Sequence, residues 1–298
     1  MSFSSYLQSL GHSKSTIAGH EQNVLMLEKW AEKEGIELLN ISYQDLLAYT
    51  KELTKRGTGK STVSSYLNSI RHYYNHQLEE NTIMKNPATH LLIKGMKRKM
   101  VYDVLNPLEL EAGYHKFTIT PTTSRHPLKD LEYQRNTVML GLLIYQGVTA
   151  QELIRLQPKD IQLRQGEIYI PGSRKSNERT LKLEAVQILD IQEYLLKTRT
   201  EILQANNRKL EQLFISVGWS DSLYPTLRKF TNSIRKQNSR IQDLQQIRAS
   251  VIVKWLKNYN LRQVQYMAGH RYVSSTEKYK LNDLRDLQED INKFHPVI

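Results

Sequence analysis

A histidine and a tyrosine near the C-terminal end of the chain have types and spacing that could do chemistry together. Gly269 directly precedes His270, and Tyr279 follows nine residues after that histidine. Gly269 is a plausible helix end, which would place His270 at an exposed corner. The short polar segment before Tyr279 could return the tyrosine to the same cleft. Upstream, Gln245 and Arg248 open a predicted helix, and a guanidinium is a natural clamp for a phosphate group.

The chain carries an excess of positive charge, which favours a polyanionic partner. Its 298 residues include 42 Lys and Arg against 30 Asp and Glu, which gives a formal net charge of +12. Neutralising phosphates releases condensed counterions, so such an excess most often serves nucleic acid. A basic protein that binds nothing acidic is the alternative. An anionic membrane surface is disfavoured, because no strongly amphipathic basic helix is evident at either end.

The absence of cysteine and of long apolar stretches excludes several classes of protein. Without cysteine, disulfides and cysteine-based metal sites are impossible. The first residues lack the pattern of a signal peptide, and the longest apolar stretch, residues 138–148, is too short to span a bilayer. We therefore expect a cytoplasmic, soluble protein that makes no membrane contact.

Two further patterns could be taken for ligand sites, but both are incomplete. Residues 57–62 look like a phosphate-binding loop, yet Thr54 stands where that motif needs a glycine. His72 and His76 lie one helical turn apart, but no third metal ligand is evident, so surface or partly buried histidines are the better interpretation. His12, His20 and His90 are scattered along the chain. We expect no metal and no cofactor.

Helical spacing dominates and divides the chain into two parts. Residues 1–95 are predicted to form a compact helical domain, with one helix ended by Gly35, a second over residues 42–53 and a third beginning at Thr62. Residues 96–104 form a basic linker. Its Lys97, Arg98 and Lys99 are either a solvated surface or a contact to a DNA backbone. A larger domain then spans residues 105–298.

The larger domain is predicted to be mainly helical, with one exception. Residues 167–170 and 179–183 alternate in the manner of strands, and a cationic segment with Arg174 and Lys175 separates them, which predicts a β-hairpin. Further helices are expected over residues 185–197, 226–236, 245–256 and 261–267. The expected fold class is mainly α with a small β-hairpin, α+β.

In this order and spacing, Arg248, Gly269-His270 and Tyr279 resemble the tyrosine site-specific recombinases, the phage integrase and Xer-like family. That family has His-x-x-Arg, then Gly-His, then Tyr nine residues beyond that histidine. The similarity extends over nearly the whole chain, because residues 13–87 resemble the family's N-terminal core-binding (SAM-like) domain and residues 147–161 resemble the opening of its catalytic domain. The resemblance implies DNA recombination, for example integration of a mobile element.

The resemblance also implies a mechanism and a set of residues. The Tyr279 hydroxyl would attack a phosphodiester of double-stranded DNA, giving a 3′-phosphotyrosyl link without any nucleotide cofactor. Arg248 would stabilise charge on the phosphate oxygens and His270 would assist by hydrogen bonding. Lys175, with Arg174 adjacent, would protonate the leaving 5′-oxygen. The candidate DNA-binding residues are Lys60, Arg71, Lys97, Arg98 and Lys99.

Two positions depart from the family pattern. Thr149 stands where the family has its first arginine, and Gln245 replaces the first histidine. Loss of a phosphate-clamping cation costs about 2.7–4 kcal/mol of transition-state stabilisation by analogy with an oxyanion-hole donor. Either another cation compensates or the protein is a degenerate member that binds DNA without cutting it, as an accessory or regulatory protein. Arg135 is a better candidate for the compensating cation than Arg155, and Arg174 at the hairpin tip is a further candidate.

The C-terminal segment is relevant to how many copies of the chain associate. Residues 282–294 are predicted to form a helix with regularly spaced leucine and isoleucine. Family members pass such a segment to a neighbouring protomer, which implies a monomer when free and a homotetramer on DNA. The alternative is a helix that folds back onto its own domain.

Overall fold

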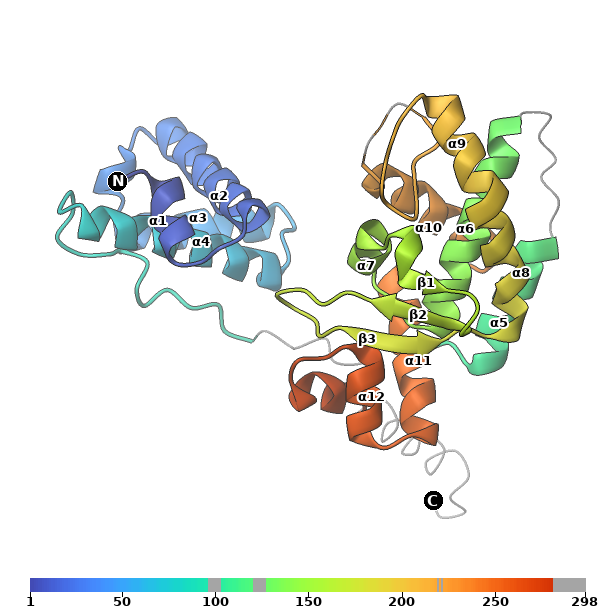
Figure 1. Cartoon of the computed structure of the whole chain (residues 1–298). Helices are drawn as coiled ribbons and strands as arrows, with labels where there is room; N and C mark the ends of the chain where they lie inside the picture. The colour runs from blue at the N-terminus through green and yellow to red at the C-terminus, as the bar shows by residue number, and fades with distance from the viewer. Residues whose placement is uncertain (96–102, 120–126, 219, 221, 281–298) are drawn as a thin grey trace, which may run out of the picture. The chain divides into compact units, whose positions relative to one another are not determined.

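The computed structural model describes residues 1–95, 103–119, 127–218, 220 and 222–280, and it forms two compact units, Met1–Arg98 and Lys99–Ile298. Helices dominate both units, and one small antiparallel sheet lies in the second (Figure 1). The expected fold class is therefore confirmed. Lys97, Arg98 and Lys99 of the predicted linker and the predicted helix over residues 282–294 lie outside the described residues.

The first unit is a helical bundle. It contains α1 (Phe3–Ser9), α2 (Lys14–Lys33), the 3-10 turn η1 (Leu38–Asn40), α3 (Tyr43–Lys55) and α4 (Lys60–Glu79). The Ser13 side chain caps α2, and Ser42 with Asp45 forms a capping box on α3. The faces of α2, α3 and α4 share a core that includes Leu27, Trp30, Leu46, Leu67, Ile70 and Tyr74.

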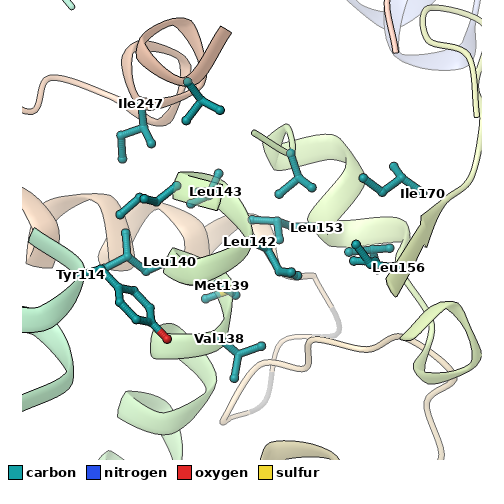
Figure 2. Close-up of a cluster of buried hydrophobic side chains, with 14 of the residues drawn as sticks. Tyr114, Val138, Met139, Leu140, Leu142, Leu143, Leu153, Leu156, Ile170 and Ile247 are labelled. Atoms are coloured by element: carbon teal, nitrogen blue, oxygen red, sulfur yellow. The ribbon is translucent and has the colours of Figure 1, made fainter. Parts of the chain in front are cut away.

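The second unit is built around one buried helix, α6 (Pro127–Tyr145). Around it lie α5 (Pro107–Ile119), α7 (Ala150–Arg155), α8 (Ala185–Glu193), the π-helical turn η3 (Tyr194–Thr198), α9 (Arg199–Asn206), α10 (Tyr224–Gln237) and α11 (Leu244–Asn258). The apolar stretch of α6 meets side chains from α5, α7, β2 and α11 in a single cluster (Figure 2). The remaining elements are η2 (Pro158–Asp160), α12 (Leu261–Ala268) and a final helix over residues 273–280.

The sheet has the order β1-β2-β3, with β1 (Ile161–Gln162), β2 (Glu167–Ile170) and β3 (Arg179–Lys182). The predicted hairpin is present, with Ile168 opposite Leu181 and Ile170 opposite Arg179. The two-residue strand β1 was not predicted, because so short a segment carries no alternation. Along β3 the alternation places Arg179 and Leu181 on the buried face. A charged side chain therefore points into the core.

Among the helices that the structure describes, none combines the length and the apolar character that crossing a membrane requires.

Candidate active site

Tyr279 and His270 lie against each other in the second unit. The Tyr279 side chain, on the helix over residues 273–280, is buried, and its ring is nearly parallel to the His270 ring, with centroids 5.9 Å apart and an interplanar angle of 9°. Gly269 caps α12 in the left-handed conformation, with φ +66°, and so turns the chain toward His270. The predicted helix end and the predicted return of the tyrosine are both present.

His270 is held in place rather than placed at an exposed corner, which corrects that expectation. Its ring is half-buried, and Nδ1 lies 2.9 Å from the hydroxyl of Thr276, a fully buried residue on the tyrosine's own helix. Burial, together with the positive charges of Arg248 and Arg179, lowers the pKa of His270 to about 4. The imidazole is therefore neutral at neutral pH.

Arg248 is buried on α11 and joins two loops of the site. Its guanidinium donates hydrogen bonds to the carbonyl oxygens of Gly147 and Ala268. Those carbonyls belong to the chain before α7 and to the end of α12, so one side chain holds both segments. A guanidinium has further N–H donors that these two carbonyls do not use. Gln245 lies three residues earlier, exposed in the first turn of the same helix.

A buried ion pair between Arg179 and Glu152 lies beside Arg248. The two guanidinium nitrogens of Arg179 lie 2.7 and 3.1 Å from the two carboxylate oxygens of Glu152, and Arg248 approaches the same carboxylate at 3.9 Å. Burial opposes ionisation of Glu152, but the hydrogen bonds and charge of Arg179, with the charge of Arg248, lower its pKa to about 2. Two cations therefore flank one carboxylate.

Thr149, which stands where the family has an arginine, has a local structural role. Its hydroxyl accepts the backbone N–H of Glu152, and the Glu152 carboxylate accepts the backbone N–H of Thr149 at 2.7 Å, which forms a capping box at the start of α7. Thr149 thus fixes the carboxylate that both arginines contact.

Arg179 was not anticipated as a site residue. Its guanidinium packs closely against Gly269. A Cβ atom on that glycine would lie only 2.5 Å from Nη1 of Arg179. The signal that could have revealed it is the strand alternation, which puts Arg179 on the same face as Leu181. Arginine is almost never fully buried without a partner, so an inward-facing arginine predicts a buried carboxylate.

The tip of the hairpin meets the loop that carries His270. The backbone N–H of Asn177 donates to the carbonyl of Gly269 at 2.9 Å, and Ser176 forms an isolated β-bridge with His270. Lys175 and Arg174 lie at this tip and are exposed. The fold therefore brings both candidate cations to the vicinity of the histidine.

Other candidates lie elsewhere. Arg135 is fully buried on α6 and donates to the carbonyl of Ile215 at 2.9 Å and to the Asn136 side chain, so the structure does not bring it to Arg248 or His270. These contacts give Arg135 a structural role on α6 and do not support the expectation that it replaces the missing clamp. Periodicity had shown which helix carries Arg135 but not what that helix faces.

In the first unit, the guanidinium of Arg71 donates to the carbonyls of Ala88 and Leu91, which ties the chain after α4 to that helix. Lys60 is exposed at the first position of α4.

A tyrosine, a histidine and a buried arginine, placed around a three-stranded sheet in a mainly helical unit, define the class of tyrosine recombinases. Residues 121–284 match the sequence model described as the phage integrase family, and residues 1–81 match that of the phage integrase N-terminal SAM-like domain. The chain belongs to the phage integrase family, which confirms the resemblance seen in the sequence. Its function is site-specific DNA recombination.

The chain matches curated tyrosine recombinases over nearly their whole length. The chain is 24% identical to the tyrosine recombinase XerD of Shewanella oneidensis, over 97% of this chain and 93% of that protein. It is likewise 24% identical to the tyrosine recombinase XerC of Oceanobacillus iheyensis, over 99% of this chain and 94% of that protein. The similarity therefore extends across both units.

Solved structures share the fold. The XerH site-specific recombinase bound to a palindromic difH substrate, a post-cleavage complex, aligns with a TM-score of 0.70 and 19% identity, over 92% of this chain and 78% of that chain. The Tn1549 transposon integrase in complex with transposon right-end DNA aligns with a TM-score of 0.65 and 13% identity, over 97% of this chain and 99% of that chain.

Proposed function

We propose that this recombinase is active and that the Tyr279 hydroxyl is its nucleophile. The observation that carries the proposal is the stacking of the Tyr279 and His270 rings beside the buried Arg248. In the proposed step, the Tyr279 hydroxyl gives up its proton to solvent and its oxygen bonds to phosphorus, while the bond from phosphorus to the 5′-oxygen breaks. The 5′-oxygen takes up a proton, which leaves a 3′-phosphotyrosyl link and a free 5′-hydroxyl. The link keeps the bond energy, so rejoining needs no nucleotide.

The neighbouring side chains have distinct proposed roles. Arg248 offers its remaining N–H donors to the non-bridging oxygens of the phosphate, where negative charge grows in the transition state. His270, neutral because of its low pKa, donates a hydrogen bond to an oxygen of the same phosphate. Lys175 at the hairpin tip supplies the proton for the 5′-oxygen. The adjacent Arg174, whose guanidinium does not give up a proton, is a candidate phosphate clamp instead. Gln245 contributes an amide hydrogen bond at most, because it cannot shuttle a proton.

Arg179 is the proposed source of the positive charge that Thr149 lacks. Its side chain is fully buried and bound to Glu152, so it is a positioning residue rather than a direct phosphate ligand. It neutralises a carboxylate that would otherwise weaken the field of Arg248. The Arg179 guanidinium also packs against the backbone of Gly269, next to His270. This arrangement replaces the earlier hypothesis that Arg135 compensates.

The proposed partner is double-stranded DNA, bound by both units. The net charge of +12 and the DNA complexes of XerH and the Tn1549 integrase support this partner. Lys60 and the linker lysines and arginine remain the proposed backbone contacts. A homotetramer on DNA, formed through residues 282–294, is proposed on the family resemblance, with a monomer in the absence of DNA.

Covalent trapping tests the nucleophile. Binding sites are first selected from random duplexes with the Tyr279→Phe variant, which should bind DNA but not cut it. The selected duplexes, nicked near the centre so that a cleaved strand cannot be rejoined, are then incubated with each variant and run on a denaturing gel. Wild type should give a protein–DNA adduct that Tyr279→Phe lacks.

The matched control is Tyr272→Phe, because Tyr272 is an exposed tyrosine seven residues before Tyr279. That variant should keep the adduct. Salt-sensitive binding of the selected duplexes by wild type with no adduct would show instead a degenerate member that binds DNA without cutting it.

A further inference from the structure

Three histidines from separate segments of the first unit meet at one point. His12 lies between α1 and α2, His20 lies on α2, and His72 lies on α4. Their ring centroids are 5.2, 5.3 and 5.2 Å apart, and one nitrogen from each ring can be chosen so that all lie within 4.8 Å of one another. His76, considered with His72 from the sequence, instead contacts the carbonyl of Met1 at 2.8 Å.

We propose that His12, His20 and His72 bind a divalent transition-metal ion, with Zn²⁺ as the first candidate. Imidazole nitrogens suit zinc, copper and nickel, and zinc accepts three histidines with a water molecule in the fourth position. The ligand atoms need to approach one another somewhat for tetrahedral coordination. Side-chain rotation supplies that movement. The site lies in the first unit and is independent of the recombination chemistry.

Hydrogen bonds around Ser69 prepare His20 for this role. The Ser69 hydroxyl donates to the carbonyl of Ser65 and accepts from the Asn23 amide, and it also lies 2.8 Å from Nδ1 of His20. With its one proton already used, the hydroxyl accepts the Nδ1–H of His20. The Nε2 lone pair of His20 is then free to bind a metal, as in metal-ligating histidines that donate their other N–H to a neighbour.

His72 supplies a second, independent observation. Its Nδ1 atom is buried and has no hydrogen-bond partner among the described residues. A buried polar atom without a partner is unfavourable and calls for an explanation such as an ion or a water molecule.

An ion at this point would join the N-terminal segment to the bundle. The backbone of His12 is already fixed, because its N–H donates to the Leu7 carbonyl and the next residue caps α2. His12 and His20 also line a cleft of about 650 Å³ that admits an ion and its water. The metal would therefore cross-link the α1–α2 junction to α2 and α4.

The test uses the full chain without an affinity tag, stripped with a chelator and dialysed at neutral pH. Co²⁺ is titrated with detection by visible absorption, and Zn²⁺ is titrated by calorimetry. We expect one ion per chain, a tetrahedral cobalt spectrum and a higher unfolding temperature with zinc. His72→Gln and His12→Gln should each weaken zinc binding by at least about tenfold, the effect typical of lost metal-site interactions.

His90→Gln is the matched control, because His90 is an exposed histidine of the same unit. It should bind as wild type does, and circular dichroism of each variant identifies any that fails to fold. His12→Gln, which changes a residue between two helices, keeps the test valid if His72→Gln is unfolded. An absence of binding to wild type, or equal binding by wild type and both ligand variants, would overturn the proposal.

Discussion

At the scale of single residues, the site depends on charge balance. Arg179 and Arg248 both lie beside Glu152. The single negative charge of that carboxylate cannot neutralise both guanidinium groups, so positive charge remains beside His270. That remaining charge acts on two groups in opposite senses. It disfavours a proton on the imidazole, and it favours the negative charge of an incoming phosphate.

The first prediction concerns the pKa of His270. Its folded-state value is about 4 against an ordinary value of 6.5, so the unfolded chain binds this proton first as the pH falls. Stability contributed by neutral His270 is therefore lost between pH 6.5 and about 4, and Glu152, with a pKa of about 2 against 4.5, extends the loss to lower pH. NMR of ¹³C-labelled histidine, assigned with His270→Gln, should show no titration of His270 above about pH 5.

The same measurement tests the role of Arg179. In the double variant Arg179→Gln/Glu152→Gln, both charges are removed and two amides can still hydrogen-bond. The lowering effect of Arg179 on His270 exceeds the opposing effect of Glu152, so the pKa of His270 should rise. An unchanged pKa, with reduced cleavage, would mean that Arg179 serves only to support the fold.

The second prediction concerns Gly269. Gly269 and Gly166 share φ +66°, but a Cβ on Gly166 would meet nothing within 4 Å, whereas one on Gly269 would collide with Arg179. Gly166→Ala should therefore cost only the left-handed penalty of about 1–2 kcal/mol. Gly269→Ala should lower the free energy of unfolding further, as measured by urea denaturation, and should reduce the covalent adduct. Equal losses in the two variants would show that the contact with Arg179 is easily relieved.

The sequence indicated the candidate tyrosine, histidine and arginine because each belongs to a local motif with fixed spacing. Arg179 was missed because its partner, Glu152, lies 27 residues away, and no local pattern joins them. The three clustered histidines were missed for the same reason, since they meet only when α2 packs on α4. Local spacing reveals motifs, whereas burial and ion pairing depend on tertiary contacts.

At the scale of elements, the hairpin and α12 are the parts that assemble the site. The hairpin tip reaches the His270 loop through the Asn177–Gly269 hydrogen bond and the bridge between Ser176 and His270. The helix over residues 273–280 then brings the Tyr279 ring against the His270 ring, and the two rings are stacked. The elements therefore meet around one histidine.

The third prediction tests Lys175 as the proton donor. If Lys175 protonates the 5′-oxygen, Lys175→Ala should slow cleavage by roughly 10²–10⁴-fold, the usual contribution of a general acid. A DNA strand with sulfur in place of that 5′-oxygen needs no protonation, because a thiolate leaves readily. The variant should therefore cleave the sulfur-containing strand at nearly the wild-type rate.

Arg174→Ala is the control on the adjacent residue, and it should slow cleavage of ordinary DNA much less. Rescue by sulfur of Arg174→Ala rather than Lys175→Ala would contradict the assignment of Lys175. Failure of sulfur to rescue either variant would exclude the hairpin tip as the source of the proton.

Most elements could be predicted because their ends carry explicit signals. Ser42 and Asp45 cap α3, Asn106 and Glu109 cap α5 by mutual hydrogen bonds, and Gly269 ends α12. The helix expected over residues 185–197 continues through η3 into α9 as far as Asn206. No capping residue interrupts it, so its true length depends on packing against α6.

At the scale of the whole molecule, the charge excess governs how strongly the protein holds DNA. A protein that contacts 6–10 phosphates loses roughly 10³–10⁵ in affinity between 50 and 200 mM salt. With a net charge of +12, we expect a fall of this order for the selected duplexes, measured by fluorescence anisotropy.

The fourth prediction applies this dependence to Lys60, which is exposed at the start of α4. Lys60→Ala should reduce the slope of log affinity against log salt by about one unit, as loss of one phosphate contact does, and should weaken binding equally for all sequences. A slope identical to that of wild type would remove Lys60 from the proposed DNA contacts.

The attachment of the hairpin tip to the His270 loop has a consequence for how this enzyme can diversify. The attachment uses main-chain groups of residues 176–177 and 269–270, so it does not depend on which side chains occupy positions 174 and 175. Substitutions at those two positions can therefore change the proposed proton donor while the tip stays attached to the His270 loop. A library confined to them should yield folded proteins with graded cleavage rates, which makes the tip a natural starting point for directed evolution of this recombinase.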